Sequence, residues 1–366
     1  MRIVIVVAAT GAGGAERVIA LLANAWIDRG WDVSIVCFEP PGTVPYYAMP
    51  SKVRLVQDPD AKRSKSGLAT ALAMLRRVGF IRRALISERP DVVVSFLTKI
   101  NVLTLAAGRG LAFPILICER NNLERQSVRS VWRYLQERLG RRATLILQTE
   151  ASRKAFSAPM RENAIVIPNP VQESSFQAGS ERRMIVAVGR LVAQKGFDLL
   201  LKAFSRQAAA FPDWNVVIWG EGPERANLER LRDDLGLQGR VEFPGITAEP
   251  GTWVTSASIF ALSSRYEGFP NVLIEAMSAG LAVASFDCPW GPSEIISPGN
   301  DGLLVPPENV AALGEALASL MESPDKRKRL GDNARLSVRR YALVNVLANW
   351  EAAFEQAKIA KSKPRP

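Results

Sequence analysis

Two cations, Arg190 and Lys195, stand five positions apart in the segment 189–196, which follows the apolar run 184–188. A short apolar run predicts a buried strand, and parallel α/β sheets bind ligands at the carboxyl ends of their strands. Arginine and lysine at such a place can neutralise the charge that develops on a departing diphosphate. The segment therefore indicates a diphosphate-binding loop, and a solvated surface loop is the alternative.

A second candidate site is the string 267–280, EGFPNVLIEAMSAG, which follows another apolar run. Pro270 and Gly280 are placed to begin and end a helix, whose first backbone N–H groups attract an anion. The Glu275 carboxylate, inside this helix, can accept hydrogen bonds from two ribose hydroxyls, while Glu267 on the loop can reach a sugar. The spacing of the two glutamates alone would recur by chance. The prediction of a nucleotide-sugar site therefore rests on the string as a whole.

A glycine-rich loop at 11–16 joins the first apolar run to an amphipathic helical pattern. Such a loop can present free backbone N–H groups to a phosphate or a sugar. A dinucleotide-binding fingerprint would have glycine or alanine at its sixth position, where this chain has Glu16, whereas Glu39 after the next apolar run suits an acidic ribose ligand. An NAD-dependent oxidoreductase therefore stays open as an alternative, as does a purely structural turn.

Several kinds of chemistry are excluded or disfavoured by residue content. Histidine is absent, which excludes a Ser-His-Asp triad and any histidine base or metal ligand. The three cysteines lie far apart, offer no zinc or redox pattern and predict buried free thiols. The segment 58–60, Asp-Pro-Asp, matches an Asp-x-Asp metal motif, but a turn at the proline explains it. We therefore expect no metal and no bound cofactor.

Apolar runs alternate with helical patterns along the whole chain. Because the runs are continuous rather than alternating with polar residues, they predict parallel strands covered on both faces. The pattern restarts after a polar stretch near residue 175, which predicts two doubly wound, Rossmann-like α/β domains facing an interdomain cleft. The expected boundaries are 1–172, 173–342, and a C-terminal helix and tail over 343–366 that could pack back on the first domain.

The net charge of +11 comes from the first part of the chain, since residues 1–172 carry 25 Lys and Arg against 13 Asp and Glu. An excess of this kind suits an anionic partner such as nucleic acid, a membrane surface or a phosphorylated substrate. Nucleic acid is disfavoured because the arginines are interleaved with aliphatic rather than aromatic residues.

The helical pattern at 68–88 combines arginines with apolar residues. This combination suits the surface of an anionic leaflet, and no run of about 20 apolar residues is present that would cross the bilayer. We expect peripheral attachment without insertion, and a solvated helix with one core-facing stripe is the alternative. The residues expected to contact the acceptor or the membrane are Arg76, Arg77, Arg82 and Arg83.

These motifs together resemble the retaining family 4 glycosyltransferases of the GT-B fold. The resemblance covers almost the whole chain, through 13–17, 189–196 and 267–275. Within the family, the sequence is most similar to bacterial N-acetylgalactosaminyltransferases that act on lipid-linked oligosaccharides. Many relatives have Ser-Glu-His after the fifth strand, where this chain has Cys118-Glu119-Arg120, and this departure leaves the donor sugar open.

The resemblance assigns roles to individual residues. Arg190 and Lys195 would bind the donor diphosphate and Glu275 the ribose, while Glu267 would contact the sugar. The catalytic residues that it implies are Glu267, Arg190 and Lys195. The donor-binding residues that it implies are Gly13, Gly14, Arg120, Arg190, Lys195, Ile246, Glu267, Gly268, Phe269, Pro270, Asn271 and Glu275.

The implied activity is a metal-independent transfer, with retained anomeric configuration, of a hexose or N-acetylhexosamine from a nucleotide diphosphate sugar, UDP-linked by preference. The acceptor would be a polyprenyl-diphosphate-linked glycan used for bacterial surface polysaccharide or glycoprotein glycans. Attack would come from the face of the leaving phosphate, which takes the acceptor proton; Glu267 as a nucleophile is the alternative. The expected location is cytoplasmic, peripheral on the inner face of the cell membrane.

Overall fold

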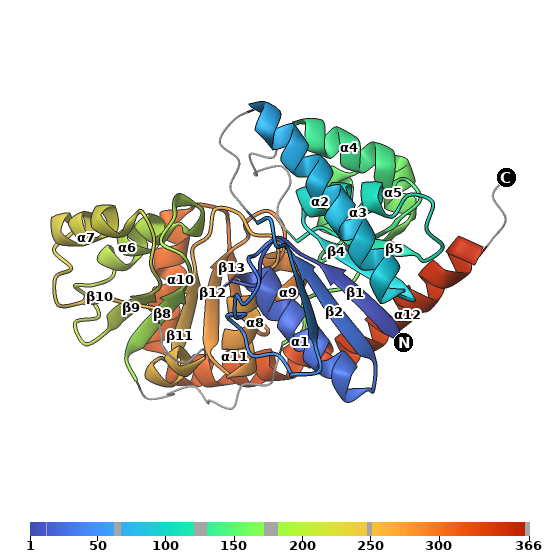
Figure 1. The fold of residues 1–366 in the computed structure, drawn as a ribbon. Helices are drawn as coiled ribbons and strands as arrows, with labels where there is room; N and C mark the ends of the chain where they lie inside the picture. Colours follow the sequence, from blue (N-terminus) through green and yellow to red (C-terminus); the bar gives the residue numbers. More distant parts are fainter. Residues whose placement is uncertain (12, 62–66, 121–129, 172–181, 247–250, 363–366) are drawn as a thin grey trace. The chain divides into compact units, whose positions relative to one another are not determined.

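The computed structural model describes residues 1–11, 13–61, 67–120, 130–171, 182–246 and 251–362 (Figure 1). The chain forms two compact units, one made of Met1–Pro170 with Val344–Pro366 and the other of Val171–Leu343. The structural boundary therefore lies between 170 and 171, against the 172/173 boundary expected from the sequence. None of the helices in the described ranges combines the length and apolarity needed to span a bilayer.

The described part of the first unit contains a seven-stranded parallel sheet of order β3-β2-β1-β4-β5-β6-β7. The strand order reverses between β1 and β4, so the sheet is doubly wound. Its strands are β1 Arg2–Val6, β2 Asp32–Cys37, β3 Arg54–Gln57, β4 Val92–Phe96, β5 Ile115–Cys118, β6 Thr144–Leu147 and β7 Ala164–Val166. Its helices are α1 Gly14–Asp28, α2 Gly67–Glu88, α3 Thr98–Ala107, α4 Ser130–Gly140, η1 Ala151–Ala155 and α5 Ala158–Glu162.

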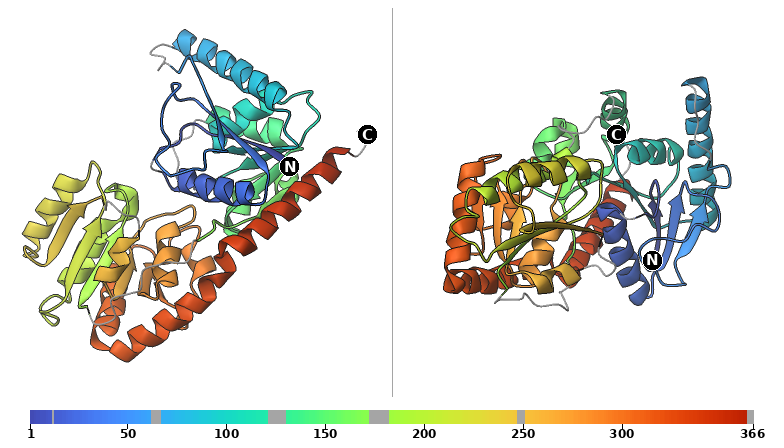
Figure 2. Two further views of the ribbon diagram at one scale, coloured as in Figure 1. Left: turned by 60° about the horizontal axis from the view of Figure 1, so that its bottom comes forward. Right: turned by 90° about the vertical axis from the view of Figure 1, so that its left-hand side faces the viewer.

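The C-terminal helix α12, Leu343–Ser362, lies against the first unit (Figure 2). Aromatic side chains make the contact. Trp350 and Phe354 are fully buried and lie 5.9 and 5.4 Å, between ring centroids, from Trp26 of α1. Burial of large aromatic surfaces dominates the energy of such contacts. An ion pair between Arg29 and Glu351, 2.7 Å, lies beside this cluster.

The described part of the second unit contains a six-stranded parallel sheet of order β10-β9-β8-β11-β12-β13. Its strands are β8 Met184–Val188, β9 Asn215–Trp219, β10 Val241–Gly245, β11 Ile259–Leu262, β12 Ala282–Phe286 and β13 Leu303–Val305. Its helices are η2 Ala193–Lys195, α6 Phe197–Ser205, α7 Arg225–Asp234, η3 Thr252–Ser256, α8 Asn271–Ser278, α9 Pro292–Ile295, α10 Val310–Glu322, α11 Pro324–Ser337 and η4 Val338–Tyr341.

Both sheets have a continuous apolar core, as the uninterrupted strand patterns predict. All residues of β4, β11 and β12 are buried, and hydrophobic clusters lie on both faces of the second sheet. Cys37, Cys118 and Cys288 are buried free thiols, which confirms the expectation for the cysteines. Burial raises the pKa of the Cys118 thiol to about 12, so it stays protonated at neutral pH.

Candidate active site

The two candidate motifs of the second unit meet because β8 and β11 are neighbours in the sheet, where the strand order reverses. Such a reversal separates the connections that follow the two strands and leaves room for a ligand at their carboxyl ends. The loop 189–196 leaves β8 and the loop 263–270 leaves β11. Residues 72 positions apart, Lys195 and Glu267, are thereby brought into direct contact.

The contact is a charge-assisted hydrogen bond in which Lys195 Nζ donates to Glu267 Oε1 over 2.7 Å. Ser264 Oγ donates to the same oxygen over 2.6 Å. The side chains of Lys195 and Glu267 are only 17% and 6% exposed, so water screens the pair weakly. Within the described residues, the second oxygen of Glu267, Oε2, accepts no hydrogen bond. It is therefore available to a hydroxyl group of a ligand.

The cation loop is fixed against the end of β11. Ser263 Oγ donates to the Lys195 carbonyl over 3.0 Å, and Gly196 has φ +61°. A Cβ atom at Gly196 would lie 2.0 Å from the Ser263 carbonyl oxygen, so only glycine allows this close approach. Arg190, by contrast, is exposed on the loop, and its side chain makes no ion pair with any described residue.

The loops 189–196 and 263–270 are also joined by Arg265, whose contacts were not predicted from the sequence. Arg265 binds Asp198 with two hydrogen bonds of 2.8 Å and donates to the Ala193 carbonyl over 2.7 Å. Burial alone would raise the pKa of Asp198, but the hydrogen bonds and charge of Arg265 outweigh it and hold that pKa below its usual range. The Arg265–Asp198 pair therefore stays charged at neutral pH, and its hydrogen bond to the Ala193 carbonyl holds the loop that carries Lys195.

Helix α8 begins at Asn271, and Pro270 is its N-cap. Pro270 provides no side-chain cap and the first turn contains no acidic residue, which suits a helix start that attracts an anion. Phe269 is buried and packs edge-on against Tyr341 at 5.7 Å, which fixes the loop before the helix. Glu275 is half-buried in the second turn. Ile246, which follows β10, is 69% exposed.

The first glycine loop is closed at its helix end by Glu16, and the assigned donor contacts of Gly13 and Gly14 stay predictions. Gly13 is the N-cap of α1, and the Glu16 side chain folds back so closely that a Cβ at Gly13 would lie 1.9 Å from Oε2. Burial raises the pKa of Glu16 above its usual range, and the charge of Glu39 adds to this. The chain's own carboxylate thus lies at the helix end where a phosphate would bind. Gly13 and Gly14 therefore suit a sugar hydroxyl better than an anion.

Glu39, the residue that suited a dinucleotide ribose, has a structural role. Its Oε2 accepts hydrogen bonds from the backbone N–H and the hydroxyl of Thr10, over 2.8 and 2.7 Å. Asp58 likewise serves a turn, because its Oδ1 accepts the Asp60 N–H over 3.0 Å. Neither contact supports the oxidoreductase alternative or a metal at the Asp-x-Asp segment.

Arg120 lies inside the first unit. Its guanidinium is over the rings of Phe96 and Trp350, at 5.4 and 5.7 Å, and Nη1 donates to Asn169 over 2.5 Å. Nε and Nη2 are buried without a hydrogen-bond partner among the described residues. Arg120 thus packs against α12 as well as the end of β4, and its assigned contact with the donor stays a prediction.

Glu119, beside it, is buried, and burial raises the pKa of its carboxyl to about 7, although hydrogen bonds from Thr98 and Gln136 oppose the rise. The folded state therefore holds a proton that the unfolded chain releases near pH 4.5, so this group lowers the stability as pH rises toward 7. At pH 8 we expect Glu119→Gln to raise the melting temperature, because removing the buried carboxylate adds up to about 3 kcal/mol to the free energy of unfolding. At pH 5 the melting temperature should change little.

Thermal unfolding of the variant and the wild type at both pH values checks this. Glu162→Gln, at an exposed glutamate of the same unit, is the matched control and should change neither melting temperature. An equal effect of Glu119→Gln at pH 5 and pH 8 would contradict a protonation equilibrium.

The four arginines of α2 lie in different surroundings. Arg76 and Arg83 are exposed, as a surface contact requires. Arg77 lies over the Phe38 ring at 5.0 Å. Arg82 donates to the carbonyls of Ala107 and Arg109, over 2.8 and 2.9 Å, and so satisfies the end of α3. We therefore exclude Arg82 from the surface proposed below.

Comparison with known proteins finds family matches that together span residues 13–337. The profile described as Glycosyl transferase 4-like domain matches residues 13–170, and the profile described as Glycosyl transferases group 1 matches 170–337. A Campylobacter jejuni α-1,4-N-acetyl-D-galactosaminyltransferase, named for a PP-undecaprenol-linked acceptor, is 27% identical over 98% of this chain and 100% of its own. An uncharacterized glycosyltransferase of Haemophilus influenzae is 27% identical over 93% of this chain and 96% of its own.

Solved structures agree on the fold. HepE of Anabaena in complex with UDP and glucose superposes with a TM-score of 0.79, covering 97% of this chain and all of that one at 19% identity. The lipopolysaccharide galactosyltransferase WaaB in its apo form gives 0.77 over 97% and 99%, at 21% identity. The two Rossmann-like units and these matches define a GT-B glycosyltransferase. The chain belongs to glycosyltransferase family 4 and is similar to the Campylobacter N-acetylgalactosaminyltransferases, as expected from the motifs.

Proposed function

We propose that the chain transfers a hexose or N-acetylhexosamine from a UDP-linked donor to a polyprenyl-diphosphate-linked glycan, with retention of configuration and without a metal or cofactor. The contact of Lys195 and Ser264 with Glu267, beside the start of α8, is the observation that carries the donor site. The complex of HepE with UDP and the acceptor named for the Campylobacter enzyme support the choice of donor and acceptor.

In this proposal, the departing diphosphate meets three positive groups. Lys195 and Arg190 are cationic, and the start of α8 presents the positive end of its helix dipole. Such preorganised donors stabilise charge that grows in the transition state, which is the role a metal would otherwise take. The leaving phosphate then accepts the proton of the attacking hydroxyl.

Glu267 is assigned to the donor sugar. Its Oε1 already accepts hydrogen bonds from Lys195 and Ser264, which engages this oxygen and leaves it poorly placed to attack a sugar carbon. Oε2 can accept a hydrogen bond from a sugar hydroxyl. The ion pair thus favours a binding role for Glu267 over the double-displacement alternative.

Thermal-shift screening against UDP, GDP and ADP tests the donor site, because a ligand that binds the native state raises the melting temperature. We expect a shift that is largest with UDP and grows with its concentration. Equal shifts with all three nucleotides would contradict a UDP donor, and no shift with any of them would contradict the donor site itself.

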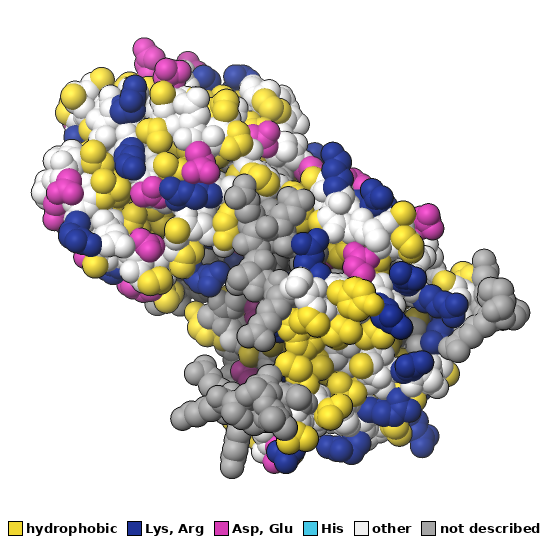
Figure 3. All heavy atoms as spheres, turned by 90° about the horizontal axis from the view of Figure 1, so that it is seen from above, with side chains coloured by type: hydrophobic (Ala, Val, Ile, Leu, Met, Phe, Trp, Pro, Cys, Tyr) yellow, Lys and Arg dark blue, Asp and Glu magenta, His cyan; other side chains and the backbone are white. Residues whose placement is uncertain are grey.

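The proposal also places the enzyme on the inner face of the cell membrane, through α2 and α4. Both helices carry exposed apolar side chains: Leu72, Leu75, Val131 and Tyr134. Figure 3 shows hydrophobic side chains gathered over the first unit beside many Lys and Arg side chains. Basic residues near an anionic leaflet contribute about 1 kcal/mol each.

Liposome flotation measures this attachment. We expect the wild type to float with anionic vesicles at low salt and to be released from them at high salt. It should not bind neutral vesicles. Replacing Arg76 and Arg83 by Gln should reduce flotation, whereas Lys202→Gln with Arg206→Gln, an equal loss of charge on the second unit, should not. Equal binding to neutral vesicles would contradict the electrostatic attachment.

A further inference from the structure

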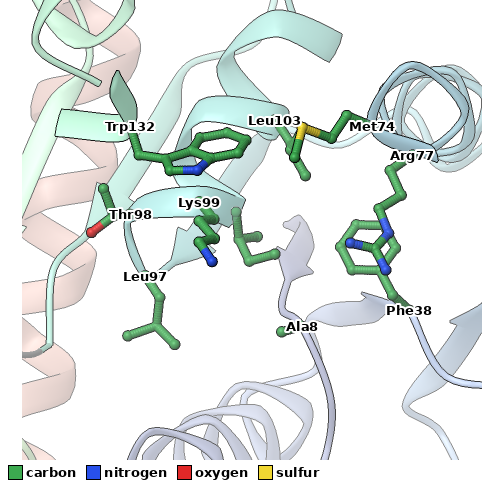
Figure 4. A pocket seen from close by; sticks show the side chains of 10 residues that line it. Ala8, Phe38, Met74, Arg77, Leu97, Thr98, Lys99, Leu103 and Trp132 are labelled. Carbon is green, nitrogen blue, oxygen red and sulfur yellow. The ribbon is translucent and has the colours of Figure 1, made fainter. Parts of the chain in front are cut away.

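The first unit contains a mostly apolar cavity of about 370 Å³ at the carboxyl ends of β1, β2 and β4 (Figure 4). Helices α2, α3 and α4 contribute its walls. Its apolar lining includes Phe38, Met74, Leu97, Leu103 and Trp132. The size is at the lower end of ordinary ligand pockets and suits a short aliphatic chain rather than a glycan.

Two cations line the same cavity. Arg77 approaches from α2, with its guanidinium over the Phe38 ring, and Lys99 approaches from the first turn of α3 (Figure 4). Neither side chain pairs with an acidic group of the described residues, and Lys99 is exposed. A largely apolar cavity with two uncompensated positive charges is complementary to an amphiphile that has an anionic head.

We propose that this cavity binds the diphosphate and the adjoining isoprene units of a prenyl diphosphate, with Arg77 and Lys99 holding the diphosphate. A free sugar would leave the apolar wall exposed to water, and a neutral lipid would leave both cations without a partner. The exposed Leu75 of α2 and Tyr134 of α4, two of the cavity's wall helices, could accompany a longer chain toward the bilayer. The inference rests on the proposed function, in which the acceptor is lipid-linked.

Calorimetric titration with farnesyl diphosphate, in the absence of membranes and nucleotide, tests the cavity. We expect farnesyl diphosphate to bind at least tenfold more tightly than inorganic pyrophosphate, because the apolar chain is buried as well. Equal affinities for the two probes, or no binding of farnesyl diphosphate, would overturn the proposal.

Neighbouring residues of α2 provide matched variants. Arg77→Gln should weaken farnesyl diphosphate binding about tenfold, whereas Arg76→Gln removes the same charge outside the cavity and should change it less than twofold. Met74→Gln should weaken farnesyl diphosphate but not pyrophosphate, and Ile86→Gln, at an exposed apolar residue of α2 outside the lining, should affect neither. Equal effects of Arg76→Gln and Arg77→Gln would overturn the site in favour of diffuse charge attraction.

Lys99→Gln gives an independent test at an exposed position and should weaken both probes. The UDP-induced thermal shift, measured on the same proteins, separates the two proposals. A normal UDP shift without farnesyl diphosphate binding overturns the cavity alone. If the variants change the affinity for farnesyl diphosphate as expected but UDP gives no thermal shift, the cavity is supported and the proposed function is contradicted.

Discussion

Lys195→Ala is expected to lower kcat about a hundredfold and to change the KM for the nucleotide sugar much less. The ammonium group lies 2.7 Å from Glu267 in a site that is largely shielded from water, and the charge that it meets grows as the diphosphate departs. Loss of one preorganised donor of this kind typically costs about 10²–10³ in rate. Steady-state kinetics with varied donor concentration measure both parameters.

Removing Lys195 also leaves the buried Glu267 carboxylate with Ser264 as its one side-chain partner among the described residues, so the melting temperature of each variant must be measured alongside. Lys195→Arg, which keeps the charge, should retain more activity than Lys195→Ala. Lys202→Ala, at an exposed lysine on α6, should leave kcat unchanged. A loss confined to KM would reduce Lys195 to a docking contact.

Arg190 gives a check on the same assignment. If Arg190 and Lys195 act on one leaving group, the double alanine variant should lose less activity than the product of the single losses. If the two losses of activity simply multiply, the residues act independently and not on one leaving group.

Glu275→Ala is expected to weaken UDP binding at least tenfold. A carboxylate that accepts two ribose hydroxyls makes charge-assisted hydrogen bonds of about 1.5–3 kcal/mol each. The measurement is calorimetric titration with UDP and with 2′-deoxy-UDP. The wild type should prefer UDP, and the variant should lose that preference, because the group that senses the 2′-hydroxyl is gone.

Glu315→Ala, at an exposed glutamate on α10, serves as the control and should bind both nucleotides like the wild type. If Glu275→Ala keeps the full preference for UDP over the deoxy nucleotide, the ribose assignment is wrong.

The sequence is sufficient to predict the doubly wound architecture, because buried parallel strands are continuously apolar and the glycine and proline signals mark where they end. It also predicts that the segments around Lys195 and Glu267 face one ligand, because both follow strands of one sheet. The direct ion pair, Ser264 and the Arg265–Asp198 pair could not be predicted, since they depend on which strands become neighbours.

Some signals were present but ambiguous. Glu16, three residues after Gly13, has the spacing of a residue that folds back on a helix start, which explains its position in the structure. Helical periodicity placed Arg76 and Arg83 on one face, and both are exposed. It could not separate Arg82, whose partners at Ala107 and Arg109 come from α3 and its end. Tertiary partners of this kind are outside any local pattern.

The most direct test of the central claim is the mass of a prenyl-diphosphate-linked glycan acceptor after incubation with the protein and a UDP-sugar. UDP-glucose, UDP-N-acetylglucosamine and UDP-N-acetylgalactosamine are tried in turn, with Lys195→Ala as the inactive control. We expect an increase of one hexose or N-acetylhexosamine residue with at least one donor, and little or none with the variant. An unchanged acceptor mass with every donor, from folded wild-type protein that binds both UDP and the acceptor, would contradict the central claim.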